Sequence, residues 1–460
     1  MNKVKVPNTV SYMMTVPKDK QEIKTPEAIL YRLGKTKELK ISDVILSKHS
    51  NHPVAVIEYK GKKYNIEFYT ETFTIPKGYV FMHKFAPDDL KVFQQEFTGV
   101  TTVMKYDENP LECYHLQLKF MQCIIPNMAG AVDFNTERVL SGVWLGMAAM
   151  SNTPPAPYHL CAVSAVSESP ESKTVWMHTH GLNRCGFCEF EIINADKERV
   201  NECGNILTCI VNNILCSGSF PDEKQPFDFA NFSKPEYEFR ITWLDYKTAV
   251  ERYDPKVVGG KNDHQISHNM FVASVFAYMS ESDEKNNILT DINDIPLEQL
   301  KNAACAVPAP ENNRASQLAR ERLGFLRDGV NLHNKSKALV KICLAFNKDG
   351  RKAMEYVWIN LHRIDNQMIY GVVETPPAFS DSVKKGDAIK VEISALTDWI
   401  LYTENYPVTP DTSYLIVEEM VAYKQHLLNK PENNTAKSEQ PELASADDIS
   451  GIDDIIKNMD

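Results

Sequence analysis

The stretch Trp176–Glu191, which reads WMHTHGLNRCGFCEFE, holds the densest set of reactive side chains in the sequence: two His, two Cys, one Arg and two Glu. His178 and His180 are two residues apart, so in a strand both side chains would point to the same face. Gly181 and Gly186 supply backbone conformations that other residues resist. The stretch is therefore either a functional site or the turn around which its domain is organised.

A zinc site is one alternative. The residues that would bind the metal are His178, His180, Cys185 and Cys188. The two Cys have the C-x-x-C spacing of a zinc knuckle. Only four residues separate the second His from the first Cys, whereas structural zinc sites usually join their halves by about a dozen residues. So short a connection leaves little chain to surround a tetrahedral ion. The favoured prediction is therefore no cofactor, with zinc as the alternative.

Thiol chemistry is a second alternative, because Arg184 and the nearby His would lower the pKa of Cys185 or Cys188, as a nucleophilic thiol requires. A redox C-x-x-C pair normally lies at the start of a helix, whose dipole favours the thiolate. Here the pair leads into an expected strand over residues 188–193, which argues against a thioredoxin-like role. A metal- or thiol-dependent enzyme centred on these His and Cys residues is the alternative function.

The favoured interpretation of the stretch is a structural turn. Arg184 is expected to pair with Glu189 or Glu191 across the turn, and the two His to form local hydrogen bonds. The candidate cluster, functional or structural, comprises His178, His180, Arg184, Cys185, Glu189 and Glu191.

The composition predicts a soluble globular protein of two to three domains, since 460 residues, of which 43% are hydrophobic and 24% charged, exceed one ordinary core. The net charge of −11 and the absence of a basic block argue against nucleic-acid binding. The longest apolar run, residues 142–150, is too short for a membrane span, and the N-terminus lacks a secretory signal. We therefore expect a cytoplasmic protein whose ten Cys are free thiols.

The N-terminal part, residues 1–105, is expected to form a small α+β domain. Its clearest element is a helix that Thr25 caps and Pro26 begins, with Gly34 past its end. The other expected elements are strands at 10–16 and 81–85, a hairpin with arms at 54–59 and 64–69, and a helix at 87–96.

The central part, residues 106–305, is expected to form a second α+β domain that contains the Trp176–Glu191 stretch. An apolar helix through Met150 is predicted to begin after a cap at Asn135 or Thr136 and to lie deep in the core. The remaining expected elements are helices at 111–125, 203–215 and 296–305 and strands at 129–134, 158–166, 174–179, 188–193 and 238–243.

The Pro-rich segment 306–313 is the best linker in the sequence, and residues 314–428 are expected to form a third α+β domain, with one helix on an antiparallel meander. Residues 429–460 are expected to be a disordered acidic tail, since residues 431–460 alone carry a net charge of −6. Within the tail, residues 447–459 hold apolar side chains at three- and four-residue spacing and are predicted to dock on a partner protein as an amphipathic helix. The predicted fold class is thus α+β, in three domains with mainly antiparallel sheets.

Six short motifs of the C-terminal domain carry a family pattern: Ala319-Arg320, Glu355–Ile359, Gly371, Pro376-Pro377, Gly386-Asp387 and Asp398-Trp399. On these residues the domain resembles the YegJ-type domain of unknown function, over about residues 314–417. Relatives carry a Gly-rich segment after the last pair, where this sequence has Tyr406–Pro410. The resemblance therefore implies the domain fold but not a surface formed by that segment.

The whole layout resembles a family of uncharacterised multidomain proteins of bacteria. The residues that carry this resemblance are His178–Gly186 followed by Glu189 and Glu191. The more distant relatives of the central domain keep Thr179, Gly181-Leu182, Gly186 and the two Glu. The resemblance implies a bacterial, cytoplasmic protein and brings no established activity.

The favoured function is that of a non-enzymatic protein that binds another protein, in an immunity- or stress-related context. Three features favour it: no catalytic constellation is recognisable, the domains are small α+β modules, and the acidic tail ends in an apolar stripe. The partner is expected to be a protein, and neither a nucleic acid nor a membrane.

Overall fold

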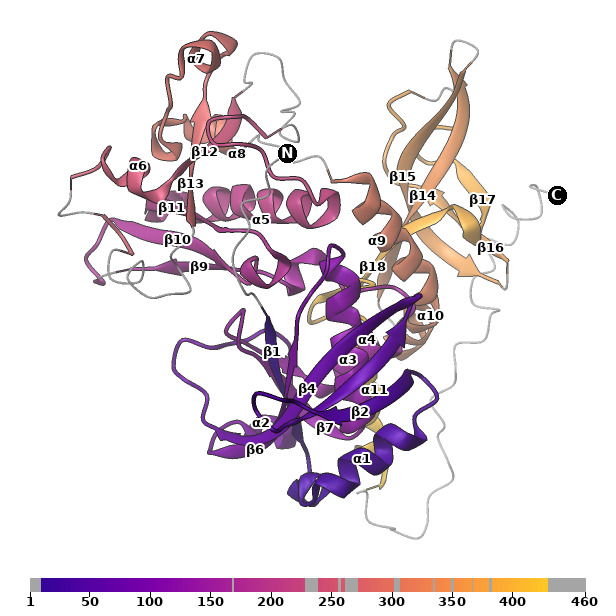
Figure 1. Ribbon diagram of the computed structural model, residues 1–460. Coiled ribbons are helices and arrows are strands. Elements are labelled where there is room, and N and C mark those ends of the chain that lie inside the picture. The colour runs from indigo at the N-terminus through magenta and orange to yellow at the C-terminus, as the bar shows by residue number, and fades with distance from the viewer. Residues whose placement is uncertain are drawn as a thin grey trace. The chain divides into compact units, whose positions relative to one another are not determined.

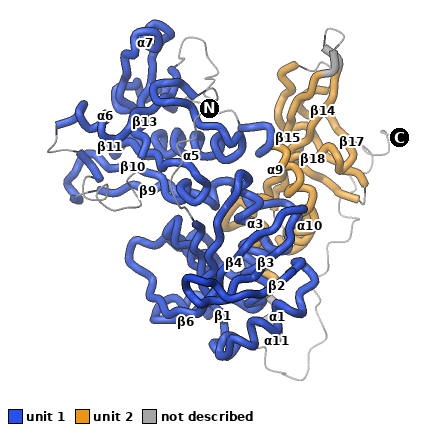
Figure 2. Tube along the Cα trace, in the orientation of Figure 1, with its two compact units in different colours: residues 1–311 blue, residues 312–460 orange. Residues whose placement is uncertain are grey.

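The structure is a computed structural model that describes residues 10–167, 169–227, 239–254, 258–260, 272–301, 307–333, 336–348, 351–365, 367–379 and 383–428 (Figure 1). The described residues form helices and three mostly antiparallel sheets, which confirms the predicted α+β class. The chain divides into two compact units, residues 1–311 and 312–460 (Figure 2). The predicted acidic tail lies outside the described residues. No helix in the described ranges is long and apolar enough to cross a membrane.

The first sheet of unit 1 has eight strands in the order β2-β3-β4-β6-β1-β7-β8-β5. The strands are β1 Ser11–Pro17, β2 Lys40–Leu46, β3 Pro53–Tyr59, β4 Lys62–Phe73, β5 Val80–Phe81, β6 Phe97–Met104, β7 Met128–Asp133 and β8 Arg138–Ser141. The helices of this part are η1 Lys20–Ile23, α1 Pro26–Lys35, α2 Pro87–Val92, α3 Pro110–Ile124 and α4 Gly142–Met150. Because β7 and β8 extend the sheet that β1 belongs to, the predicted boundary at residue 105 falls inside one sheet.

Helix α1 begins where the sequence predicts. The Thr25 hydroxyl accepts a hydrogen bond from the Ala28 amide, and a proline occupies the first helical position. The helix extends two residues further than predicted: Gly34 lies inside it, and the helix ends at Lys35. Gly34 has no positive φ angle, so it is not the left-handed residue that often ends a helix.

Helix α4 begins later than the sequence analysis predicts, at Gly142. Its cap is Ser141, whose hydroxyl accepts a hydrogen bond of 3.1 Å from the Trp144 amide. The predicted caps, Asn135 and Thr136, instead precede β8, whose residues pair with β7. The chain therefore makes a β-hairpin before it becomes helical.

The second sheet of unit 1 has five strands in the order β12-β13-β11-β10-β9. The strands are β9 Ala162–Val166, β10 Thr174–His180, β11 Glu189–Asp196, β12 Arg240–Asp245 and β13 Val272–Tyr278. The helices are η2 Pro157–His159, η3 Asn183–Cys185, η4 Lys197–Arg199, α5 Val200–Ser217, α6 Tyr246–Val250, α7 Glu281–Asn286, η8 Ile292–Asp294 and α8 Leu297–Lys301. Helix η2 takes the first residues of the strand predicted at 158–166.

Strand β13 is an interior strand of the second sheet that the sequence analysis did not predict. It runs parallel to β11 and antiparallel to β12, so it lies inside the sheet. All seven of its residues are buried. A strand that is buried on both faces has no polar alternation, which explains why its sequence VASVFAY gave no clear strand signal.

Unit 2 is built on a six-stranded antiparallel sheet in the order β17-β16-β15-β14-β18-β19. The strands are β14 Lys337–Lys348, β15 Arg351–Ile364, β16 Met368–Val373, β17 Ala388–Glu392, β18 Leu396–Tyr402 and β19 Pro407–Val408. The helices are α9 Ala309–Glu321, α10 Leu323–Leu332, η9 Ile393–Ala395 and α11 Tyr414–Leu428. The sheet confirms the predicted meander of residues 338–393, but three α-helices replace the single one that was expected.

The core of unit 2 explains the extra helices. Trp399 on β18 is fully buried, and its indole Nε1 donates a hydrogen bond of 3.0 Å to the Ala319 carbonyl on α9. Leu326 of α10 and Ile416 of α11 belong to the same core. The predicted linker 306–313 overlaps α9, which begins at Ala309, and the boundary between the two units falls after residue 311.

Candidate functional site

The Trp176–Glu191 stretch covers β10, η3 and the start of β11, so it is a β-arm, a tight connection and the returning β-arm. Gly181 and Gly186 have φ angles of 112° and 81°, in the region that favours glycine. A Cβ atom on Gly181 would also lie 2.2 Å from the Leu160 carbonyl oxygen. The role predicted for these two glycines, a backbone that other residues resist, is thus confirmed.

The Glu189 carboxylate closes the connection from inside. It accepts hydrogen bonds from the Thr179 hydroxyl at 2.7 Å, the Gly181 amide at 2.9 Å and the Asn183 amide at 3.1 Å. The Thr179 oxygen in turn accepts one from the Phe190 amide at 2.8 Å. Burial raises the pKa of Glu189 to about 7, although its three hydrogen bonds lower it. The carboxyl group of Glu189 therefore holds the turn together, and its ionisation is costly because the group is buried.

The Glu191 carboxylate ties three strands of the second sheet together. It accepts hydrogen bonds from the Trp176 indole Nε1 of β10 at 2.7 Å and from the Ser274 hydroxyl of β13 at 2.6 Å. Glu191 and Ser274 are register partners in the parallel pair β11–β13. The side chain of Glu191 is completely buried, so this carboxylate is part of the interior of the sheet.

Arg184 reaches into the other sheet of unit 1. Its Nη1 and Nη2 atoms donate to Oδ1 and Oδ2 of Asp133 on β7, at 3.0 and 2.9 Å, and both side chains are fully buried. The same guanidinium donates to the Leu160 carbonyl at 2.8 Å and to the Ser11 hydroxyl at 3.2 Å, and it lies over the Tyr114 ring. The pairing of Arg184 with Glu189 or Glu191 was therefore a wrong prediction. Those carboxylates bind donors of their own sheet.

The ion pair continues into a buried polar network of the first sheet. The Tyr106 hydroxyl donates to Gln117 Oε1 at 2.8 Å, and its oxygen lies 3.1 Å from the Ser11 hydroxyl oxygen, within hydrogen-bond distance. Gln117 Nε2 donates to the Thr102 hydroxyl at 3.0 Å. We call Arg184, Asp133, Ser11, Tyr106, Gln117 and Thr102 the buried brace.

Sequence reasoning missed every member of the buried brace except Arg184. The six residues are spread over five elements from β1 to η3 and the loop after β6, so no local spacing connects them. One signal was available. Asp133 ends the apolar strand MAGAVD, and Gln117 interrupts an apolar helix, and a polar group in such a position needs a buried partner.

His178 and His180 lie on one face of β10, as predicted. Their Nε2 atoms are 2.6 Å apart, so one ring donates a hydrogen bond to the other. The His178 ring also stacks on the Trp176 indole, with 3.6 Å between ring centres and an angle of 16°. The two rings therefore form a local hydrogen bond, as the structural interpretation expects.

Cys185 and Cys188 are both buried. Burial raises the pKa of Cys185 to about 12 and that of Cys188 well above its usual range. This direction is opposite to the one that a nucleophilic thiol requires. Cys209 on α5 is disulfide-bonded, which contradicts the expectation of free thiols at that position.

The four predicted metal ligands do not form a ligand set in this structure. Within the ranges that the structure describes, no three His, Cys, Asp or Glu side chains are placed to hold a metal ion. The arrangement that the stretch does form is a closed set of internal hydrogen bonds. Its chemistry is that of a scaffold that joins two sheets.

We expect Cys185 and Cys188 to react slowly with iodoacetamide at neutral pH in the folded protein, because both thiols are buried and have raised pKa values. Cys216 and Cys343 are only half-buried and serve as internal controls. Mass spectrometry of peptides after timed alkylation measures all four. Labelling of either buried thiol as fast as the controls would support the thiol-dependent alternative.

Two sheets joined by a buried ion pair, followed by a separate α+β unit, define a multidomain α+β protein. Residues 11–155 match the family model described as Protein of unknown function (DUF4026) N-terminal, and residues 163–276 match its C-terminal counterpart. Residues 327–430 match the model of an uncharacterised protein conserved in bacteria, DUF2314. The chain thus contains both domains of DUF4026 followed by a DUF2314 domain. The comparison with curated proteins found no match, and neither did the comparison with solved structures.

The family matches show in which half of DUF4026 each of the described features lies. The eight-stranded sheet lies within the N-terminal DUF4026 match, and the Trp176–Glu191 stretch lies within the C-terminal one. The Arg184–Asp133 ion pair therefore joins the two halves of DUF4026. The match boundary between residues 155 and 163 also agrees with the end of the first sheet and its helix α4.

Proposed function

We propose that the chain acts by binding another protein. The reactive side chains of the Trp176–Glu191 stretch support this proposal because they are buried and engaged in internal bonds. The matched family models name no activity. Further parts of the proposal are a bacterial cytoplasmic location and an immunity- or stress-related role. We also propose that the C-terminal domain is similar to the YegJ-type domain.

The observation that carries the proposal is the open edge of the eight-stranded sheet. Strand β2 is the last strand in the sheet, and no strand in the described part of the chain pairs with its outer edge. Val44, Ile45 and Leu46 on this strand are 37%, 47% and 64% exposed, and Leu30 and Tyr31 of α1 are 41% and 67% exposed. An exposed edge with apolar side chains is a template for another chain.

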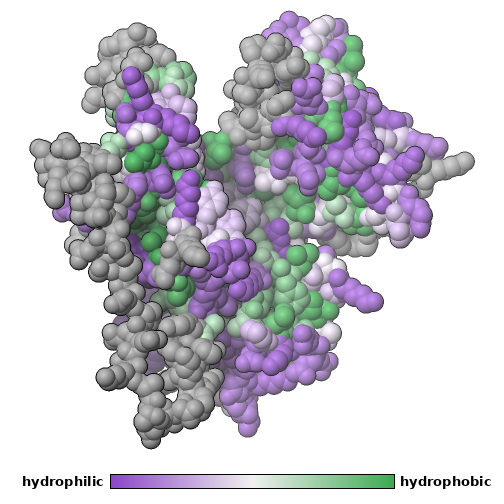
Figure 3. All heavy atoms as spheres, turned by 180° about the vertical axis from the view of Figure 1, so that it is seen from behind, coloured by the Kyte–Doolittle hydropathy of each residue, from purple (hydrophilic) through white to green (hydrophobic). Residues whose placement is uncertain are grey.

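Exposure alone would not identify a docking surface. Hydrophobic residues reach the surface between hydrophilic ones elsewhere, as the green spheres among purple ones show on the face drawn in Figure 3, and such scattered residues are normal. The edge at β2 differs because exposed apolar side chains coincide there with backbone groups that have no neighbouring strand. Both are contacts that a partner protein can complete.

A photo-crosslinking amino acid at Tyr31 tests the proposal in a lysate of the source bacterium. We expect a discrete crosslinked protein that an excess of unlabelled full-length chain suppresses. The matched control is the same amino acid at Phe379 of unit 2, which is 62% exposed. Equal products at both positions, or none at Tyr31, would contradict the proposed surface.

Deleting residues 431–460 tests whether the tail is a second contact with the partner. If the captured protein and its yield do not change, the tail is not such a contact.

A further inference from the structure

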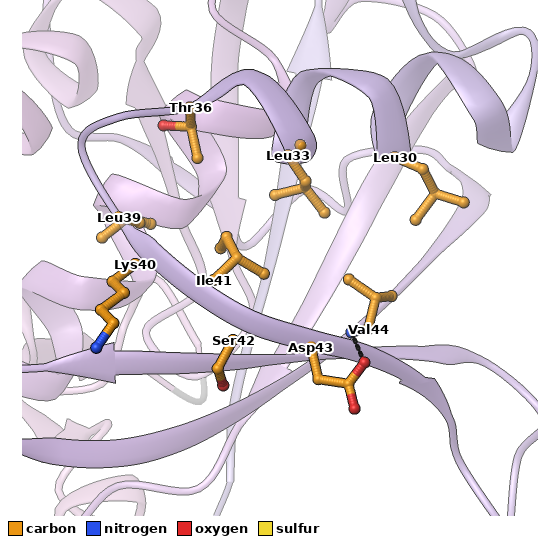
Figure 4. Close-up of a pocket in the computed structure, with 10 residues that line it drawn as sticks. Leu30, Leu33, Thr36, Leu39, Lys40, Ile41, Ser42, Asp43 and Val44 are labelled. Carbon is orange, nitrogen blue, oxygen red and sulfur yellow. Dashed lines mark hydrogen bonds between the residues drawn. The ribbon is translucent and has the colours of Figure 1, made fainter.

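A groove runs between helix α1 and the open strand β2. Its apolar lining is Leu30, Leu33, Leu39, Ile41 and Val44, its polar lining is Thr36, Lys40, Ser42 and Asp43, and Gly34 completes it. The cavity has a volume of about 550 Å³. Figure 4 shows the leucines of α1 facing Ile41 and Val44 of β2 across the space. We call this feature the α1–β2 groove.

The backbone of β2 turns hydrogen-bonding groups toward the outer edge of the sheet. The Ser47 amide donates to the His52 carbonyl at 2.8 Å, so this amide points toward β3. Amides alternate in direction along a strand, so those of Leu46 and Val44 point to the outer edge. The Val44 amide donates at 2.8 Å to the carboxylate of its neighbour Asp43, which agrees with this direction. The Asp43 carboxylate thus occupies one outward amide of the edge, and a strand that adds to β2 has to displace this local bond at Val44.

The chain around the groove is basic, although the protein is acidic. Residues 18–48 contain eight Lys or Arg and five Asp or Glu, whereas the whole chain has a net charge of −11. Lys35, Lys37 and Lys40 are exposed at the end of α1 and the start of β2, with Glu38 between the last two. Lys40 lines the groove and pairs with Glu58 of β3, and Asp43 lines the groove farther along β2. The groove therefore has an apolar lining with an excess of cations beside the end of α1, which complements an acidic and apolar ligand.

We infer that the α1–β2 groove binds an extended peptide segment of a partner protein, which adds a strand to β2. Alternate side chains of the peptide are apolar and occupy the space between Leu33 and Val44. Acidic residues of the peptide lie at the end near Lys37. Main-chain hydrogen bonds supply the affinity and the side-chain pockets supply the specificity, as in other cases of strand addition. This inference rests on the proposed function and specifies its partner.

Gly34 allows the groove to be filled from inside the protein. A Cβ atom at this position meets no atom within 4 Å, and the residue lies in a helix with an ordinary φ angle. Gly34→Phe should therefore occupy the groove without an internal clash, and it should not weaken the helix, since glycine is the poorer helix former. Gly324 of α10 also has open space for a Cβ, so Gly324→Phe is the matched control in unit 2.

The cationic end allows a second, independent test. Lys37→Glu should weaken the binding of an acidic peptide and reduce its dependence on salt, because an exposed charge pair is screened by ions. Lys48→Glu makes the same change in net charge beyond the end of β2. This second control separates a local charge effect from the total charge of the protein.

The probe is a fluorescein-labelled peptide in which Ile alternates with Thr and two Asp stand at one end, titrated into the full-length protein and followed by anisotropy. We expect Gly34→Phe to weaken binding at least about tenfold and Lys37→Glu about threefold, with both controls unchanged. N-methylation of alternate peptide amides should abolish binding if the peptide adds as a strand.

The possible failures have different meanings. If the probe does not bind, or if Gly34→Phe binds it as well as Gly324→Phe does, the inference is overturned. If the N-methylated probe binds as tightly as the parent probe, strand addition is overturned. If the crosslinked partner at Tyr31 is captured equally by the Gly34→Phe protein, the proposed function stands while the groove is excluded as its site.

Discussion

Replacing Arg184 by alanine is expected to lower the free energy of unfolding of unit 1 by about 3–5 kcal/mol, since the change leaves the Asp133 carboxylate buried without its counter-charge. The guanidinium also supplies hydrogen bonds to Ser11 and to the Leu160 carbonyl, which lose their donor. Urea unfolding followed by hydrogen exchange of β7 and β10 measures the loss within unit 1.

Two controls separate the charge effect from a general loss of contacts. The double variant Arg184→Met with Asp133→Leu removes both charges and is expected to be more stable than Arg184→Ala, because a buried ion pair is often replaced by apolar residues at little cost. Lys62→Ala, which removes surface ion pairs with Asp107 and Glu108, should cost far less stability, because ion pairs at the surface contribute little. Equal losses for the single and the double variant would show that the charge pair contributes nothing specific.

Glu189→Gln is expected to change the pH dependence of stability. Burial raises the pKa of Glu189 from 4.5 to about 7 in the folded state. Between these two values the folded protein binds more protons than the unfolded chain, so the stability from this group is complete below pH 4.5 and is lost as the pH rises through 7. The total loss is about 3 kcal/mol. The variant cannot titrate at this position and should lack this slope.

The informative quantity is the difference in unfolding free energy between Glu189→Gln and the wild type, measured by urea titration at each pH. His83 and His115 have pKa values lowered to about 3 by burial, so their protonation destabilises the fold in acid. This opposite slope is present in both proteins and cancels in the difference. A difference that does not vary with pH would mean that the carboxylate of the folded protein keeps an ordinary pKa.

The sequence predicted the local features of the candidate site but not its long-range partner. Glycines in the left-handed region and two His on one face are properties of a few adjacent residues, and both are found. The partner of Arg184 depends on which strands meet, and Asp133 lies 51 residues earlier in the sequence. Because Glu189 and Glu191 were nearer in sequence, the prediction chose them. The geometry instead gives Glu189 donors in the connection between β10 and β11 and gives Glu191 a donor on β13 of its own sheet.

The same physical limit applies to the α1–β2 groove. The start of α1 could be predicted from the sequence, since its Thr cap and the Pro at its first position act within one turn of the helix. Strand β2 was not predicted, because a register shift between Ile41 and Asp43 breaks its alternation. That β2 is the last strand of a sheet is a property of the whole topology. No pattern within Lys40–Leu46 could reveal it.

The contact between Arg184 and Asp133 has a consequence for how unit 1 can be divided. Either half alone would lose the counter-charge of its buried group together with the residues of the other half that cover that group. The two DUF4026 halves therefore depend on each other for stability at this contact, since a charge taken from its buried partner is costly. A cut between residues 155 and 163 agrees with the family matches but divides this shared interior.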